Sequence, residues 1–266
     1  IKKQLPINGD RWSGGVKDKF EVPNVHSTFG FIFKLGSAYV VPYSKFYRSE
    51  RILLALTNAM DCVLNVQHSD GTVDLHSTNF HSTPDTAFMV NYLSPVYVCI
   101  KELKDPNSAP LLKRMETFLR NVSKCLLVGG AHTANHRWVI CSALSRINSF
   151  FPSKKYLDRM EDWLAEGIDL DPDGQYTEMS VGSYSSVCDE MFITMEQIQL
   201  QLSNMNPILL HDMQKFHPGA FQQFRTHKEV FLFDLVRANM QWGIEEGYYR
   251  SDLDTDILCR YRLASM

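Results

Sequence analysis

Apolar residues recur at helical spacing along most of the chain, and this periodicity constrains the fold more than any other feature of the sequence. In residues 49–67 (SERILLALTNAMDCVLNVQ), the apolar side chains fall on one face of a helix, and Ser49 is suited to cap it. Strand signal is weak, and residues 1–30 are expected to be extended or irregular. The sequence therefore predicts an all-α fold, most simply a layered array of antiparallel helix pairs. Further helices are expected at residues 86–103, 108–127, 136–150 and 153–166 and from residue 185 onward.

Composition excludes several classes of function. The 266-residue chain carries a net charge of −3, whereas a general nucleic-acid binder is usually strongly basic, so no nucleic-acid partner is expected. No apolar run approaches the roughly 20 residues that cross a bilayer, so no membrane partner is expected. The 6 cysteines include no pair at CxxC spacing, which argues against a metal site or a redox dithiol and favours small buried thiols. Nothing in the sequence indicates a cofactor.

Three polar stretches between the predicted helices concentrate unusual side chains. If neighbouring helix pairs bring these stretches to one edge of the fold, they form a polar cleft with aromatic patches. Such a surface suits sugars, because hydroxyl groups need polar partners and the apolar face of a sugar ring needs aromatic side chains. The candidate residues are His76, Asn79 and His81 in residues 68–87, Asn135, His136, Arg137 and Trp138 in residues 129–138, and Tyr176, Glu178 and Tyr184 in residues 168–184.

Several of these residues also have a purely structural interpretation. Asn135 could cap the helix that follows it, Trp138 could belong to the core, and Asp173 could serve only the turn in DPDG. The histidines do not form a recognisable metal motif, because HTANH at residues 132–136 is not HExxH and no acidic residue lies at ligand spacing.

Four stretches of residues 1–193 together resemble the N-terminal part of heparinase II/III-like proteins, which are relatives of polysaccharide lyases. The most specific element is the pair Asn135 and His136 followed by a DGxY…Y loop. The resemblance implies an incomplete α/α toroid, a periplasmic or secreted location, and an acidic polysaccharide or oligosaccharide as partner. The four stretches are WSGGVKDKFEVPNVHSTFGF, VQHSDGTVDLHSTNFHSTPDTAF, GGAHTANHRWVICSAL and WLAEGIDLDPDGQYTEMSVGSY.

The chemistry that the resemblance implies is β-elimination at a uronic acid. Asn135 and His136 would neutralise the uronate carboxylate, and Tyr184 would act as base, acid or both. Tyr176 is the competing tyrosine. The family's toroid is longer and continues into a β-sandwich that does not follow here, so an incomplete lyase is expected. The remaining candidates would contact substrate: His76, Asn79, His81, Arg137, Trp138 and Glu178.

Residues 194–266 resemble the C-terminal region of Tet repressor-family transcriptional regulators. The stretches that carry this resemblance are NPILLHDMQKFHPGAFQQF, FDLVRANMQWGIEEGYYR and DLDTDILCRYRL, and their apolar pattern predicts helices over residues 221–246 and 254–265. The resemblance implies a cytoplasmic ligand-binding module that forms a homodimer through residues 221–266. No helix-turn-helix precedes it, so no sequence-specific DNA binding is expected.

Two partial resemblances to unrelated families in one chain favour a chimeric sequence, with predicted domains 1–193 and 194–266. A natural fusion and a misleading resemblance in one half are the alternatives. The join is expected within residues 188–200, where both families have helix.

Overall fold

The computed structural model of the protein confirms the all-α fold. It describes residues 1–131, 133–167, 171–172, 176–177, 184–201, 219, 222, 226, 230, 233–245, 254–257 and 259, and most of these residues are helical. None of the described helices is long and apolar enough to cross a membrane. The longer helices are α1 (Val25–Val40), α2 (Glu50–Val66), α3 (Thr83–Glu102), α4 (Ala109–Val128), α5 (Ala134–Phe150), α6 (Lys154–Ala165), α7 (Tyr184–Gln201) and α10 (Phe233–Glu245). They are accompanied by the 3-10 turn η1 (Pro106–Ser108) and the strands β1 (Val73–Leu75) and β2 (Asn79–Ser82).

The chain forms two compact units, and each is described by itself. Unit 1 comprises residues 1–132 and 142–156, and unit 2 comprises residues 133–141 and 157–266. Helix α5 therefore contributes its first half to unit 2 and its second half to unit 1. The domain boundary predicted at residues 193 and 194 does not coincide with this division. It falls inside α7, which runs through the expected join without a break.

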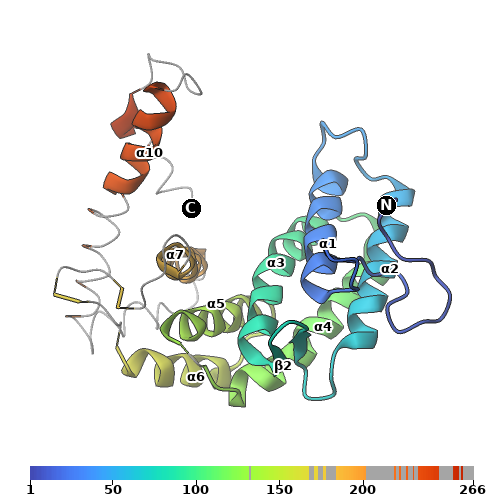
Figure 1. The fold of residues 1–266 in the computed structure, drawn as a ribbon, viewed down its shortest axis with the longest axis horizontal. Helices are drawn as coiled ribbons and strands as arrows, with labels where there is room; N and C mark the ends of the chain where they lie inside the picture. The colour runs from blue at the N-terminus through green and yellow to red at the C-terminus, as the bar shows by residue number, and fades with distance from the viewer. Residues whose placement is uncertain are drawn as a thin grey trace. The chain divides into compact units, whose positions relative to one another are not determined.

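Unit 1 is built from two antiparallel helix hairpins, α1 with α2 and α3 with α4 (Figure 1). The start of α1 and the end of α2 both approach Gly15, whose surroundings include the Thr28 hydroxyl and the Cys62 thiol. Likewise, the start of α3 and the end of α4 meet where Thr83 contacts Gly129. In each pair, the first turn of one helix thus lies beside the last turn of the other.

The hairpins stack so that corresponding helices run parallel. Along α1 and α3, His26 lies beside Asp85, and Gly36 lies against Val96 about three helical turns later on both helices. Along α2 and α4, Arg114 Nε donates to Asp61 Oδ1 at 2.6 Å.

The second half of α5 continues the row of α1 and α3. The Ser142 hydroxyl and Arg146 Nε both donate to Asn91 Oδ1 of α3, at 3.0 and 2.9 Å. Further along both helices, the rings of Tyr97 and Phe150 lie 5.0 Å apart. Unit 1 therefore contains a row of three parallel helical segments, α1, α3 and the second half of α5, and α1 and α3 are each followed by an antiparallel partner.

The core of unit 1 lies between these helices and explains the helical periodicity of the sequence. Phe29 of α1 and Phe118 of α4 are fully buried, with ring centroids 5.1 Å apart. Burial of such side chains contributes about 1.5–3 kcal/mol each relative to exposure. The other large side chains without exposed surface in this core include Ile32, Tyr39, Leu56, Met60, Met89, Leu93, Tyr97, Ile100 and Leu111.

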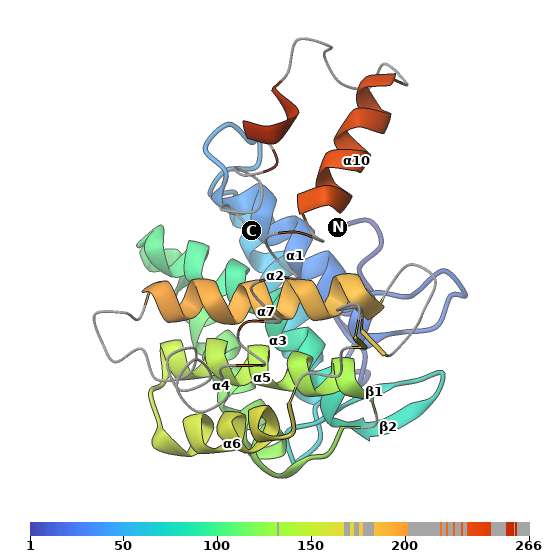
Figure 2. The same cartoon turned by 90° about the vertical axis from the view of Figure 1, so that its left-hand side faces the viewer.

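The structure corrects two expectations for the polar segments. Residues 25–30, expected to be extended or irregular, form the first part of α1, whose N-cap Asn24 accepts a hydrogen bond from the Ser27 amide. The sequence did not predict this helix, because it contains two glycines and several aromatic and β-branched residues, which have low helix propensity. Residues 68–87, expected to be loop, contain the antiparallel β1–β2 hairpin, which Figure 2 shows beside the start of α3.

A glycine turn fixes the hairpin segment against α4. Gly71 has φ +92°, in the left-handed region, and a Cβ atom there would overlap the backbone carbonyl of Asn121. The Gly71 carbonyl accepts a hydrogen bond from Gln67 Nε2 at 2.9 Å, which holds the turn closed. Only glycine adopts this positive φ without strain and has no Cβ atom to overlap the Asn121 carbonyl.

We expect Gly71→Ala to lower the free energy of unfolding by about 2 kcal/mol or more, because the new side chain meets backbone and forces a strained φ. The measurement is urea unfolding followed by circular dichroism. Gly130→Ala is the matched control, since a Cβ at Gly130 meets nothing within 4 Å and its φ is ordinary. Equal stability of the two variants would contradict this account of the turn.

Candidate functional site

One end of unit 1 gathers polar side chains from several segments. The antiparallel pairing puts the starts of α1 and α3 and the ends of α2 and α4 at this end, together with the β1–β2 hairpin. We call it the hairpin end, comprising residues 12–28, 62–86 and 121–129. Because loops between regular helices are where binding groups are commonly mounted, this end is the natural candidate site in unit 1.

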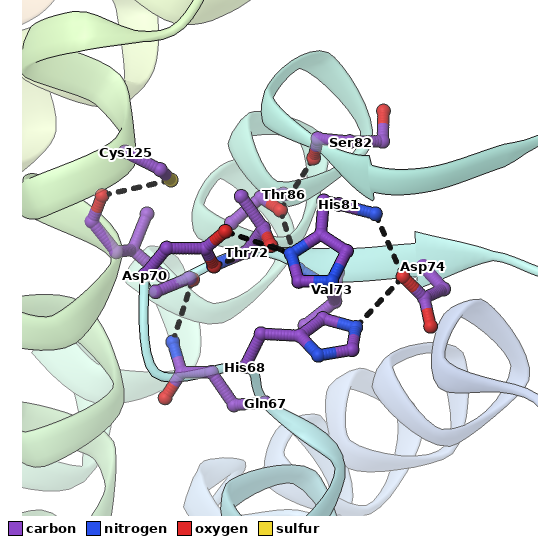
Figure 3. A network of polar contacts seen from close by, with 12 residues as sticks. Gln67, His68, Asp70, Thr72, Val73, Asp74, His81, Ser82, Thr86 and Cys125 are labelled. Atoms are coloured by element: carbon purple, nitrogen blue, oxygen red, sulfur yellow. Dashed lines mark hydrogen bonds and ion pairs between the residues drawn. The ribbon is translucent and has the colours of Figure 1, made fainter.

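Two histidines stack face to face at the hairpin end, and each is bonded to its own aspartate (Figure 3). The rings of His68 and His81 are 3.8 Å apart between centroids and 23° from parallel. His68 Nε2 lies 2.8 Å from Asp74 Oδ1, and His81 Nδ1 lies 2.7 Å from Asp70 Oδ2. Each carboxylate thereby fixes the orientation of one imidazole, as it does for histidines that act on ligands.

The backbone of the hairpin depends on the same carboxylates. The His81 amide donates to Asp74 Oδ1 at 2.8 Å, and the Thr72 amide and hydroxyl both donate to Asp70 Oδ1. His81 has φ +51°, an uncommon conformation for a residue with a side chain. The polar network therefore organises the hairpin as well as the imidazoles.

These contacts lower the pKa of both carboxyl groups. Burial raises the pKa of Asp70, but hydrogen bonds from Thr72 and His81 and the charge of His81 outweigh it and lower the pKa to about 2. For Asp74, burial also raises the pKa, and contacts with His81 and His68 reverse the shift to a net lowering. Both side chains are therefore carboxylates at neutral pH.

A third carboxylate, Asp85, lies deeper and holds one of the predicted site residues. Asp85 is 8% exposed, and its Oδ2 accepts from the Ser82 hydroxyl at 2.5 Å and from Asn79 Nδ2 at 3.4 Å. His26 Nε2 lies 3.5 Å from Oδ1, a distance that suits an ion pair better than a strong hydrogen bond. Burial raises the pKa of Asp85, and the contacts with His26, Ser82 and Asn79 produce a net lowering.

The remaining predicted residue of unit 1, His76, contacts an aromatic ring from the N-terminal segment. The rings of Trp12 and His76 meet edge to face, 5.1 Å apart between centroids and 85° from parallel. Trp12 and His76 are both partly exposed, and Phe80, on the same hairpin as His76, is 70% exposed. This end therefore presents aromatic and imidazole rings to solvent.

Four predicted residues of unit 2 are buried in this structure: Asn135, Arg137, Trp138 and Tyr176. Asn135 is 2% exposed, and its Oδ1 accepts from the Thr133 hydroxyl at 2.5 Å. Arg137 is 7% exposed and donates to Glu166 Oε2 at 2.7 Å. These side chains contact protein groups, so the expectation that they lie on an open polar surface does not hold here.

Trp138, the third of them, has the features of a core residue. It is 0% exposed, and its ring centroid lies 4.7 Å from that of Phe192 in α7. Arg137 also lies over the indole ring, with its guanidinium carbon 5.1 Å from the centroid. The structural interpretation of Trp138 therefore accounts for its position.

Of the two candidate tyrosines in unit 2, the structure describes the side chain of Tyr176 only. Tyr176 is 6% exposed, and its hydroxyl donates to Asp189 Oδ1 at 3.0 Å. Burial, followed by the nearby Asp189 carboxylate, strongly raises the pKa of Tyr176. Tyr184 is the first residue of α7.

The other candidates of unit 2 can be placed only in part. His136 lies partly exposed in α5, whereas Asp173 and Glu178 lie outside the described residues.

Sequence reasoning overlooked the groups that organise the hairpin end. Trp12 stands beside two glycines in a segment judged irregular, and His68, Asp70 and Asp74 stand in a segment treated as loop. The closely spaced histidines and aspartates of residues 68–85 were the available signal. In the part of the chain that the structure describes, no group of three or more His, Cys, Asp and Glu residues is arranged to hold a metal ion.

Little of the predicted dimerisation region falls among the described residues. Within residues 221–266, α10 is joined to the segment 254–259 by Arg237, whose Nε lies 3.0 Å from Asp256 Oδ1. A sulfur contact of 3.7 Å between Cys259 and Met240 joins the same two segments. Homodimer formation through residues 221–266 stays a prediction.

No protein-family model, curated protein or solved structure matches this chain.

We expect the stability of unit 1 to depend on pH through Asp70. A carboxyl group whose pKa is lowered by folding contributes stability above its unfolded pKa of about 3.9, and loses it as the pH falls through the folded value. Asp70→Asn should therefore reduce the free energy of unfolding most above about pH 5, and the difference from the parent should shrink toward pH 2. Because the Asp70 side chain is 49% exposed, we expect at most about 1 kcal/mol at neutral pH.

Urea unfolding at a series of pH values measures this difference. Asp162→Asn, at a carboxylate 70% exposed in unit 2, is the control and should show no such trend. A constant difference between Asp70→Asn and the parent from pH 6 to pH 3 would rule out the role given to Asp70.

Proposed function

We propose that the protein binds uronate-containing acidic glycans at the hairpin end of unit 1. We also propose that the chain cleaves such glycans by β-elimination with His136 and Tyr184 as catalytic residues, and we give Asn135, which is buried and accepts from the Thr133 hydroxyl, a structural role. The observation that carries this proposal is the contact between Trp12 and His76. Trp12 and His76 lie more than 60 residues apart along the chain, in two of the stretches that resemble heparinase II/III-like proteins. Their meeting at one end favours a common role for the two stretches.

The surface around this contact has the chemistry that sugars need. The partly exposed rings of Trp12 and His76, with the exposed ring of Phe80, offer apolar area to a pyranose face. The imidazoles of His76 and His81 offer hydrogen bonds to hydroxyl groups and, when protonated, charge to a carboxylate. Asp70 already holds the imidazole ring of His81 in place, so glycan binding would not cost the conformational entropy of ordering that ring.

The helix arrangement of unit 1 also favours the proposal. An α/α toroid is a succession of antiparallel helix hairpins in which corresponding helices of successive hairpins lie side by side. The parallel row of α1, α3 and the second half of α5 has this arrangement. A partial toroid is thus the architecture that we infer for the first part of the chain.

The structure bears on which tyrosine would act as base. Proton abstraction next to a uronate needs a base with an accessible deprotonated form. The buried Tyr176 hydroxyl donates to Asp189, and its raised pKa opposes the phenolate. We therefore assign the base to Tyr184 and a structural role to Tyr176.

Trp12→Ala should weaken binding of hyaluronan or heparan sulfate oligosaccharides about 3- to 10-fold, because one aromatic contact with the sugar is lost. Isothermal titration calorimetry measures the affinity. Tyr43→Ala is the control, since it removes an aromatic side chain that is 97% exposed in the loop at the opposite end of α1. Equal loss in the two variants, or no measurable binding by the parent protein, would exclude the hairpin end as a glycan site.

Turnover should appear as rising ultraviolet absorbance, because β-elimination leaves an unsaturated uronate. We expect Tyr184→Phe to abolish this signal and Tyr176→Phe to retain it at a temperature where the variant is folded, as checked by circular dichroism. Binding without any absorbance change in the parent would leave a glycan-binding protein and remove the catalytic half of the proposal. Activity that survives Tyr184→Phe would show that another group is the base.

A further inference from the structure

The loop between α1 and α2 exposes an unusual set of apolar side chains at the end of unit 1 opposite the hairpin end. We call residues 41–48 (VPYSKFYR) the aromatic loop. Tyr43 is 97% exposed, Phe46 and Val41 are each 42% exposed, and Tyr47 is 36% exposed. Exposed aromatic residues so close together are uncommon on a surface that faces only water.

Cations accompany these rings. Lys45 Nζ lies 5.1 Å from the centroid of Phe46, and the guanidinium carbon of Arg48 lies 5.4 Å from the centroid of Tyr47. Arg51 follows at the start of α2 and is exposed, whereas Glu50 is the single acidic residue of the segment 41–51. The segment is therefore locally cationic, although the whole chain carries a net charge of −3.

The backbone of the aromatic loop is held firmly beneath these side chains. The Arg48 amide donates to the Tyr39 carbonyl at 3.0 Å, and the Arg48 guanidinium donates to the Leu103 carbonyl at 3.0 Å. The Tyr39 hydroxyl in turn donates to Asp105 Oδ2 at 2.7 Å. The loop is thus tied both to α1 and to the segment that follows α3.

We propose that the aromatic loop docks the protein onto the surface of an anionic lipid bilayer. Aromatic side chains favour the interface between headgroups and acyl chains, and lysine and arginine beside them are attracted to anionic headgroups. Docking of this kind uses a loop at the membrane surface and needs no helix that crosses the membrane.

Acidic glycans would meet the same cations, but the rings suit them less well. A sugar stacks on a ring whose plane is fixed, and Tyr43, at 97% exposure, has almost no neighbours to fix it. The bilayer interface accepts aromatic rings in many orientations. The exposure of Tyr43 therefore favours lipid over sugar as the occupant.

The test is cosedimentation of the full chain with vesicles of phosphatidylcholine alone or with added phosphatidylserine. We expect binding to the phosphatidylserine vesicles, weakening as salt is raised, and little binding to phosphatidylcholine. Lys45→Glu/Arg48→Glu should reduce the partition constant at least about tenfold, and Tyr43→Ser/Phe46→Ser should also reduce it. Lys2→Glu/Lys3→Glu, which makes the same change in charge at two exposed lysines outside the loop, is the matched control and should bind almost as the parent does.

Each other outcome overturns the proposal. Absence of vesicle binding, or equal loss in the control and the loop variants, would show that the loop has no special role. Loop variants that lose heparan sulfate binding but keep vesicle binding would identify a glycan as the occupant. A parent dimer in light scattering that becomes monomeric in Tyr43→Ser/Phe46→Ser would identify a second copy of the chain. Trp12→Ala should leave vesicle binding unchanged, so failure of the glycan proposal is distinguishable from failure of this one.

Discussion

The close approach of α1 to α3 is the contact on which the arrangement of unit 1 depends. At Gly36 the two helices are so near that a Cβ atom would overlap the side chain of Val96. The two helices run parallel, so that both begin at the same end of the bundle. The pairing of His26 with Asp85 follows from that geometry, as does the position of the hairpin that leads into α3. The polar side chains at the starts of α1 and α3 therefore lie together because the two helices pack in parallel along their length.

The polar network at this end holds the hairpin backbone and the imidazole rings with the same carboxylates. Asp74 Oδ1 accepts from the His81 amide and contacts the His68 imidazole, so one oxygen holds both the hairpin backbone and a ring. Asp70 accepts from Thr72 with one carboxylate oxygen and contacts the His81 imidazole with the other. Such sharing gives imidazoles of fixed orientation on a short hairpin that would be only marginally stable alone. It also means that a substitution here changes the fold and any bound ligand together.

Much of the fold was predictable because packing and periodicity agree. Helices α2 and α4 were expected within about two residues of their ends, since their apolar faces are regular and glycine or a polar residue ends them. Helix α1 was not, because its residues have weak local preference for helix, although one face of it is buried in the unit. The site was less predictable. Asn135, Arg137 and Trp138 look polar or amphipathic in sequence but are buried, which depends on long-range contacts that no local pattern encodes. The pairing of Trp12 with His76 joins distant segments in the same way.

Helix α1 also sets the distance between the two ends of unit 1 that carry exposed aromatic side chains. Its 16 residues, at about 1.5 Å each, separate the aromatic loop from the hairpin end by roughly 24 Å. Mobile ions at physiological ionic strength screen exposed charges over about 8 Å. The electric potential of a charged body at one end therefore decays almost completely before it reaches the imidazoles at the other. The two ends can evolve their charges separately, and each can meet its own ligand without altering the other's protonation.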